Sequence, residues 1–527
     1  MQIQKLDIYD KKKCLENFHI PFHTPELACT NILIGENGTG KSTVMETILE
    51  ILASFDSPAI EKSIDYSYGI QYEYAQKQIF IQRIKNDYRV EVDGMLFSGS
   101  YKQIRELLDG QKLFPKRIIS FYSGANNKLQ SLIQKMNTEY KKNYRQLIHG
   151  YLYVMEHVFE YNPPKPPVRK YNFCDEHMVP ICLTAILAGS ESFEKDYLVK
   201  QCRFNHIDRI DMIIDLTKVE AFFIKDRIRG NNSLSLVSDD PDHLFQVAEY
   251  IDNQLGEYLR RGWQGAHRGK GYLGIEGLEN GGLDSVAILE FFELLHDLFG
   301  AKYEVYISMD NQVVNTRDLS EGQRQLIKIL GMLGICKNED CLILLDEPDA
   351  HMNPRWKYEI KNTMDQCLQK AQNAQAIIAT HDPLVINGVD KEYIRIFDIV
   401  QGKTVVHIPT EDTVGMGIDS LLQSQYYQMD TTLDSRSQKK LDDKRALMVK
   451  RKEGTLTEDE RKRLRVLTEE LENMPFFRSI PADNYYDDFV AAVHELYQNR
   501  PKVRLTSEEI EERNRMVREI VKGLIDK

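Results

Sequence analysis

The sequence predicts an α/β fold built on a mixed sheet with a P-loop, carrying a helical insertion and a helical C-terminal extension. A glycine-rich loop at residues 35–41 follows an apolar strand and precedes an amphipathic helix that extends to Phe55. A second apolar strand, residues 341–345, ends in two carboxylates, as buried parallel strands do at ligand sites. Helix and strand patterns then alternate to about residue 408, which is typical of a parallel sheet covered by helices.

The order of these patterns predicts four regions. Residues 1–125 carry the first strands and the glycine-rich loop, and residues 126–280 form an insertion whose Lys- and Tyr-rich start favours helices. Residues 281–428 return to helix–strand alternation, with Asp284 as the N-cap of the first helix. Residues 429–527 form a helical extension.

The extension is amphipathic along most of its length. Thr457 and Glu460 form a capping-box pattern at the start of one helix, and two further helices are expected at about 484–498 and 507–525. These helices have more apolar positions than an isolated tail needs. We therefore expect the extension to dock a partner protein.

Composition excludes several classes of protein. The chain has 527 residues, 42% of them hydrophobic, and 68 Lys+Arg against 80 Asp+Glu give a net charge of −12. Such acidity argues against a protein coated in nucleic acid but leaves room for a local basic groove. The longest nearly unbroken apolar run, Ile181–Ala188, includes Thr184 and is far shorter than the roughly 20 residues that cross a bilayer. No signal-peptide pattern is visible at the N-terminus either, so we expect a cytoplasmic protein without a membrane partner. The eight cysteines contain no Cys-x-x-Cys pair and are expected to be buried reduced thiols.

The glycine-rich loop carries the most specific motif. Its residues match the pattern G-x-x-x-x-G-K-[ST] and are followed by a further threonine: Gly35, Glu36, Asn37, Gly38, Thr39, Gly40, Lys41, Ser42 and Thr43. Glycines let the backbone curl so that its N–H groups point at phosphates, and the following helix adds the positive end of its dipole. Lys41 is expected to reach the β- and γ-phosphates of ATP and the Ser42 hydroxyl to ligate Mg²⁺.

The two carboxylates after the apolar strand are the candidate catalytic acids. Asp346 is placed to hold Mg²⁺, and Glu347 is placed to polarise the water that attacks the γ-phosphate. Together with the glycine-rich loop, they predict an ATPase.

Two further motifs complete the pattern. The sequence Leu319-Ser320-Glu321-Gly322-Gln323 begins a helix, where a hydroxyl and a glycine N–H suit phosphate binding. A later strand ends at Thr380-His381-Asp382, which leaves an imidazole at the sheet edge. A lone histidine is more often a core residue, but the neighbouring motifs favour His381 as a sensor of the γ-phosphate.

In this order, the four motifs resemble the ATP-binding-cassette (ABC) ATPases, and more closely their chromosome-maintenance and RecF/Rad50 branch than transporters. The resemblance implies a two-lobed head that forms a head-to-head homodimer around two ATP molecules. It implies that the signature residues Ser320, Glu321, Gly322 and Gln323 act on the nucleotide of the second copy. Asp349 falls in the inter-subunit loop of this family, and its surroundings, Asp349-Ala350-His351-Met352-Asn353-Pro354, look like those of overcoming-lysogenisation-defect ATPases.

One departure from the family pattern concerns a glutamine that ligates Mg²⁺ after the first lobe. The corresponding strand ends Ser120-Phe121-Tyr122-Ser123 without a glutamine, and Gln130 is not assigned to that role. Fast hydrolysis and nucleotide sensing with slow turnover both stay open.

The spacing of the motifs narrows the resemblance. Lys41 and Asp346 lie 305 residues apart, too far for a bare cassette and too close for the long coiled coil of Rad50. With its helical tail, the chain resembles the ATPase subunits of bacterial anti-phage systems, of the Septu or retron-associated, PtuA-like kind. This resemblance implies a separate HNH-type nuclease as partner and, for retrons, a bound RNA–DNA.

Alternatives remain at three points. A RecF/Rad50-like DNA repair ATPase that clamps DNA is the second reading of the whole chain, and a transporter ATPase is a third. Residues 436–465 hold 12 Lys+Arg and 6 Asp+Glu, which indicates a solvated helix face or a phosphate-contacting arm. The basic loop 260–270 around Trp263 is either a mobile surface loop or a segment that stacks a base.

Overall fold

The computed structural model describes most of the chain. It describes residues 1–25, 28–123, 127–157, 169–189, 192–219, 244–245, 248–249, 253–277, 284–310, 312–336, 340–369, 371, 374–452, 454–474 and 515–516. The helices expected at 484–498 and, apart from residues 515–516, at 507–525 lie outside this set. Contacts divide the chain into two units, residues 1–386 with 392–408, and residues 387–391 with 409–527. Apart from residues 387–391, the second unit begins at Pro409, whereas the extension was expected from residue 429.

The first unit is built around a seven-stranded sheet with the strand order β18-β17-β3-β16-β15-β8-β9. Its strands are β3 (Cys29–Gly35), β8 (Arg117–Tyr122), β9 (Tyr171–Cys174), β15 (Cys341–Asp346), β16 (Gln375–Ala379), β17 (Ile394–Val400) and β18 (Lys403–His407). All pair in parallel except β18, which is antiparallel to β17. Every residue of β3, β15 and β16 is buried, as their continuous apolar runs predict. The loops that follow these three strands therefore open at one edge of the sheet.

A second, antiparallel sheet has the order β2-β1-β4-β5-β6-β7. Its strands are β1 (Gln2–Lys12), β2 (Leu15–Pro21), β4 (Tyr68–Tyr74), β5 (Lys77–Ile84), β6 (Asp87–Val92) and β7 (Met95–Gly99). The P-loop helix α1 (Lys41–Asp56) shares one hydrophobic cluster with residues of both sheets. Most residues of α1 are buried, including all its apolar positions from Val44 to Phe55. The short helix α2 (Pro58–Glu61) packs against α1, and α3 (Tyr101–Gly110) packs against β6 and β7.

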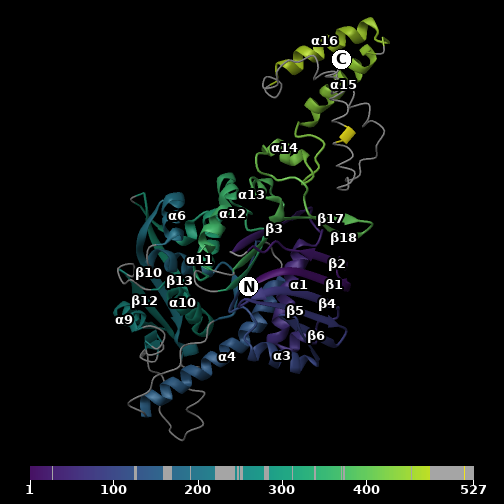
Figure 1. Cartoon of the computed structure of the whole chain (residues 1–527). Coiled ribbons are helices and arrows are strands. Elements are labelled where there is room, and N and C mark those ends of the chain that lie inside the picture. Colours follow the sequence, from purple (N-terminus) through teal and green to yellow (C-terminus); the bar gives the residue numbers. More distant parts are fainter. Residues whose placement is uncertain are drawn as a thin grey trace. The chain divides into compact units, whose positions relative to one another are not determined.

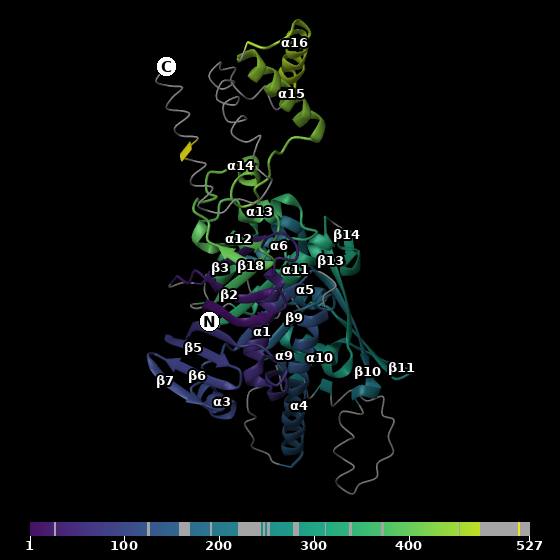
Figure 2. The same ribbon diagram turned by 90° about the vertical axis from the view of Figure 1, so that its right-hand side faces the viewer.

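The insertion expected to be helical needs correction, because it also contains strands. Its helices are α4 (Asn127–His157), α5 (Met178–Ala188), α6 (Phe193–Cys202) and α9 (Asn253–Gly262). Its strands β10 (Phe204–Asp215), β11 (Trp263–His267) and β12 (Lys270–Ile275) join β13 (Lys302–Met309) and β14 (Gln312–Asn315) in a third sheet. Pairing between β10 and β13, about a hundred residues apart, completes this sheet, and no local pattern reveals such a partner. Figures 1 and 2 show the two antiparallel sheets on opposite sides of the central sheet.

Helices and short 3₁₀ turns fill the rest of the first unit. They are α10 (Ser285–Phe299), η2 (Thr316–Asp318), α11 (Glu321–Gly334), α12 (Pro354–Leu368), α13 (Pro383–Ile386) and η3 (Lys391–Tyr393), the last of which straddles the two units. Asp284 caps α10 as predicted, since its side chain accepts the N–H of Val286. None of the helices within the described residues combines the length and apolar character needed to span a membrane.

The second unit contains α14 (Ile418–Gln423), α15 (Ser435–Lys452) and α16 (Glu458–Glu472). Leu447 of α15 packs against Leu464 and Leu467 of α16 in a small separate cluster. The capping box of Thr457 and Glu460 is confirmed.

Candidate nucleotide-binding site

The backbone conformation of the P-loop depends on its own glycines. Gly35 has a φ of +147°, and a Cβ there would lie 2.4 Å from the carbonyl oxygen of Phe397 in the neighbouring strand. Gly40, the N-cap of α1, has a φ of +103°. The Thr404 hydroxyl of β18 donates to the carbonyl of Thr39 at 2.9 Å. These contacts shape the loop so that its N–H groups can surround a phosphate.

The Lys41 ammonium lies over this loop. It donates to the carbonyls of Gly35 at 2.7 Å and of Glu36 at 2.9 Å. Burial lowers the pKa of Lys41, while the carboxylates of Asp346 and Glu347 act in the opposite direction. A cation is thus held beside the loop, where the motif requires one. Glu36, Asn37 and Gly38 form the exposed part of the loop, and Ser42 and Thr43 are half-buried in the first turn of α1.

Asp346, at the end of β15, is buried beside Ser42. Burial raises the pKa of Asp346 to about 6, against the lowering effect of a hydrogen bond with Ser42; the nearby Glu347 charge raises it further. Its Oδ2 atom makes no hydrogen bond within the described residues. A buried carboxylate oxygen without a partner and a hydroxyl oxygen beside it fit the oxygen ligands that Mg²⁺ prefers.

Glu347 and His381 lie together at the same edge of the sheet. Asp346 pairs with Ala379 in the β15–β16 ladder, so the residues that follow the two strands are neighbours. The N–H of Glu347 donates to the Ala379 carbonyl at 2.8 Å, and Glu347 adopts a φ of +50°. Its Oε1 lies 3.3 Å from Nδ1 of His381, with 35% and 55% of the two side chains exposed. This left-handed turn presents the carboxylate to solvent beside the P-loop.

Asp349, in the loop after Glu347, is buried and bonded to the histidine loop, which is the segment Thr380–Asp382. It is hydrogen-bonded to the Thr380 hydroxyl, and burial raises its pKa. The same hydroxyl accepts the N–H of Asp382 at 3.0 Å, and the Asp382 carboxylate pairs with Lys357 at 2.7 Å. The expected inter-subunit loop and the histidine loop therefore form one connected network.

The signature residues lie at the exposed start of α11 and away from the P-loop residues. Ser320 caps the helix, and it shares a capping box with Gln323. A Cβ on Gly322 would lie 2.7 Å from the His351 carbonyl oxygen, so only glycine fits there. Ser320, Glu321, Gly322 and Gln323 line a groove of about 450 Å³ with His351, Asn353 and Trp356, and no P-loop residue lines it. Within one chain the structure therefore does not bring the signature to the P-loop.

Sequence reasoning missed Gln325, which is buried on the signature helix. Its side-chain amide donates to the main-chain carbonyls of Glu347 at 3.4 Å and Pro348 at 2.5 Å. Its place two residues after the signature motif was the available signal.

Gln130, left unassigned from the sequence, lines a cavity of about 460 Å³ together with Tyr122 and Ser123 at the end of β8.

The structure does not favour the nucleic-acid interpretation of two basic segments. Residues 263–275 form the β11–β12 hairpin, and the Trp263 indole packs over Gly271 on the sheet and edge-on to Phe245 at 6.1 Å. This packing occupies the ring that was considered for base stacking. On α15 and α16, six of the cations form ion pairs with acidic residues: Lys440, Arg445, Lys450, Arg461, Lys462 and Arg463. These pairs favour the solvated-face interpretation.

Comparisons with known proteins agree with the motifs. The family described as "AAA domain, putative AbiEii toxin, Type IV TA system" matches residues 225–387. The Septu protein PtuA of Bacillus mycoides (strain KBAB4) is 27% identical over 138 residues, which are 25% of this chain and 19% of that protein. The "Retron Vc95 probable ATPase" of Vibrio cholerae serotype O1 biovar El Tor is 30% identical over 81 residues, 15% of each chain. The chain resembles ATPases of bacterial defence systems. The resemblance predicted from the motifs is thereby confirmed.

The match spans 19% and 15% of the length of these two curated relatives. Among solved structures, the Smc head domain with an extended coiled coil from Pyrococcus furiosus is 14% identical and covers 77% of this chain and 96% of that chain, with a TM-score of 0.36. The SMC head domain from Thermotoga maritima is 11% identical and covers 78% and 100%, with a TM-score of 0.33. The α/β fold itself follows from the observed sheet, in which the P-loop strand, the histidine strand and the carboxylate strand are neighbours.

Proposed function

We propose that this chain is the ATP-hydrolysing subunit of a bacterial anti-phage defence complex. ATP draws two copies together head to head, and the closed dimer gates a separate HNH-type nuclease. The observation that carries the proposal is that the P-loop and catalytic residues lie apart from the signature residues within one chain. Lys41, Asp346, Glu347 and His381 gather at one sheet edge, whereas the signature lines a groove elsewhere.

The residues of one chain account for nucleotide binding and for activation of water. P-loop N–H groups and Lys41 hold the phosphates, and Ser42 and Asp346 would hold Mg²⁺, which would neutralise phosphate charge. Glu347 accepts a proton from the attacking water, and His381 contacts the γ-phosphate. Burial raises the pKa of Asp346, and its carboxylate would have to be charged to hold the cation.

The second copy supplies the signature. Ser320 and Gly322 sit at the N-terminus of a 14-residue helix, where a hydroxyl and N–H groups can meet the γ-phosphate of the facing chain. A dimer that needs both nucleotides would couple ATP binding to a change in assembly, which is the property that a gate requires.

The defence role and the nuclease partner rest on the resemblance to PtuA and to the retron Vc95 ATPase. No His-Asn-His constellation was recognised in the sequence, so the destructive chemistry is assigned to a partner. The extension from residue 429 is proposed to dock it. A retron-type RNA–DNA is the further component that a complex of this kind would hold.

A native pull-down of the full chain from its host, with mass spectrometry and a test for nucleic acid, checks the proposal. A co-purifying nuclease supports it, and a chain lacking residues 429–527 should lose that nuclease while still binding ATP. A dimer that captures only added DNA, with DNA-stimulated turnover and no nuclease, would favour the DNA repair clamp instead.

A further inference from the structure

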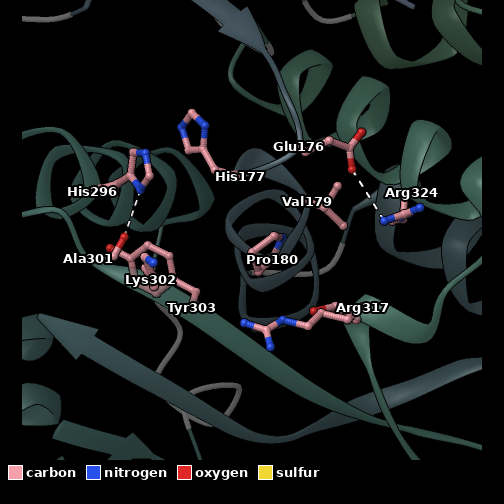
Figure 3. A pocket seen from close by; sticks show the side chains of 11 residues that line it. Glu176, His177, Val179, Pro180, His296, Ala301, Lys302, Tyr303, Arg317 and Arg324 are labelled. Atoms are coloured by element: carbon pink, nitrogen blue, oxygen red, sulfur yellow. Dashed lines mark hydrogen bonds and ion pairs between the residues drawn. The ribbon is translucent and has the colours of Figure 1, made fainter.

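A second pocket, of about 340 Å³, lies beside the signature helix and is lined by no P-loop residue. Four segments form it: the start of α5, the end of α10, the start of β13, and the segment from η2 to α11 (Figure 3). Its volume falls in the range of small-molecule sites, roughly 300–1,000 Å³.

Three cations line this pocket: Lys302, Arg317 and Arg324. Within the described residues, no side-chain hydrogen bond involves Lys302 or the Arg324 guanidinium. Arg324 has only an ion pair with Glu176, at 3.7 Å, although its side chain is just 32% exposed. Its Nε atom is buried and has no hydrogen-bond partner among the described residues, and an anion in the pocket would provide one.

The existing ion pairs leave these cations available to bind an anion. Glu176 is held more closely by Lys328, at 2.6 Å, than by Arg324. Arg317 pairs with Glu304 at 2.7 Å, but its side chain is 66% exposed, and exposed pairs are weak. The two nearby carboxylates also limit how much negative charge the pocket can accept. They favour a monophosphate over a triphosphate.

Several other side chains that line the pocket are rings, and stacking or hydrogen bonds hold them in place. The imidazoles of His177 and His296 are stacked, with centroids 3.9 Å apart and planes 9° apart. Nδ1 of His296 is hydrogen-bonded to the Ala301 carbonyl at 2.8 Å, and the Tyr303 hydroxyl donates to the Phe292 carbonyl at 2.6 Å. In Figure 3, Pro180 lies between Lys302 and Tyr303 on one side and Arg324 on the other, and the two imidazoles lie at the upper left. The apolar faces of Pro180 and Tyr303 suit a planar ring.

We propose that this pocket binds a small phosphate ester that carries a flat ring, of the chemical class of a nucleoside monophosphate. Lys302, Arg317 and Arg324 hold the phosphate by charge-assisted hydrogen bonds. Pro180 and Tyr303 contact the ring. The site is separate from the candidate ATP site and does not depend on ATP hydrolysis.

The test uses the full chain carrying Lys41→Ala, which removes the P-loop ammonium and so suppresses binding of phosphates at the candidate ATP site. Calorimetric titrations with the four common nucleoside 5′-monophosphates and with inorganic phosphate measure binding. We expect saturable binding of at least one monophosphate, about tenfold or more tighter than inorganic phosphate. The Lys302→Gln/Arg317→Gln double variant should weaken that binding by about tenfold or more.

The matched control is Lys270→Gln/Arg261→Gln, which removes an exposed lysine and an exposed, ion-paired arginine from the same part of the chain. Circular dichroism and thermal melting confirm that each variant is folded. The absence of saturable binding by the Lys41→Ala chain overturns the proposal. An equal loss in the control variant overturns it as well. Because the readout is binding without hydrolysis, failure of the ATPase assignment leaves this result unaffected.

Discussion

The side-chain amide of Gln325 donates to the main-chain carbonyl of Glu347 at 3.4 Å, so the signature helix directly holds the loop of the proposed general base. The same amide donates to the carbonyl of Pro348, and Gln325 is only 5% exposed. Ser320, at the start of this helix, is the group proposed to meet the nucleotide of a second copy. Closure of a dimer on ATP would therefore affect the position of Glu347 through a single rigid helix.

Gln325→Glu should separate binding from catalysis. A carboxylate cannot donate to the two carbonyls, so Glu347 loses its support while the P-loop is untouched. We expect kcat to fall by about tenfold, with a smaller change in the KM for ATP. Steady-state kinetics measure both values, and Gln366→Glu, at an exposed position on α12, is the control. A fall confined to ATP affinity would contradict the positioning role.

Glu347→Gln should retain ATP and accumulate the closed dimer. Removing a general base costs roughly 10²- to 10⁴-fold in rate, and slow hydrolysis leaves the ATP-bound state populated. Hydrolysis assays and size-exclusion chromatography with ATP and Mg²⁺ measure the two effects. Hydrolysis at the wild-type rate would show that another residue activates the water.

Gly322→Ala should damage the signature without removing any polar group. The added methyl would lie 2.7 Å from the His351 carbonyl, so the loop after Glu347 must shift. We expect a loss of about 1–3 kcal/mol in unfolding free energy and a clear loss of ATP turnover. Gly334→Ala, on the same helix but with no atom within 4 Å of its Cβ, is the matched control. Denaturant titration compares the two, and equal effects would refute the steric argument.

Asp349→Asn should stabilise the chain in a pH-dependent way. Burial raises the folded-state pKa of Asp349 above its ordinary value, so the stability linked to its proton is present at low pH and lost as pH rises through that pKa. An asparagine avoids the buried charge and can still accept from Thr380. We expect the variant to gain about 1–3 kcal/mol at pH 8 and progressively less toward pH 4.

Thermal melts across this pH range, without nucleotide or Mg²⁺, measure the effect of Asp349→Asn. Asp65→Asn, at an exposed position, serves as the control. A gain that is constant with pH would show that burial of the charge is not the cause.

Features that depend on neighbours in the sequence could be predicted. The P-loop, the Ser320 helix start and the Thr457–Glu460 capping box each involve residues within a few positions of one another. The buried strands of the site were also predictable, because a continuous apolar run with carboxylates at its end has few other interpretations. Glu347 and His381 were each assigned to the γ-phosphate from the sequence, and their proximity agrees with the rule that parallel strands end at one edge.

The sequence by itself thus determined the fold class, the P-loop and the residues at the sheet edge, since short-range backbone geometry and strand burial dictate them. Only the tertiary structure decided that β10 pairs with β13, that Gln325 supports Glu347 and that three cations surround the pocket beside α11. These contacts join residues from 22 to about a hundred or more positions apart. Packing of the whole chain selects such partners. The place of Gln325 after the signature motif marks that residue, but it does not specify the carbonyls that the amide meets.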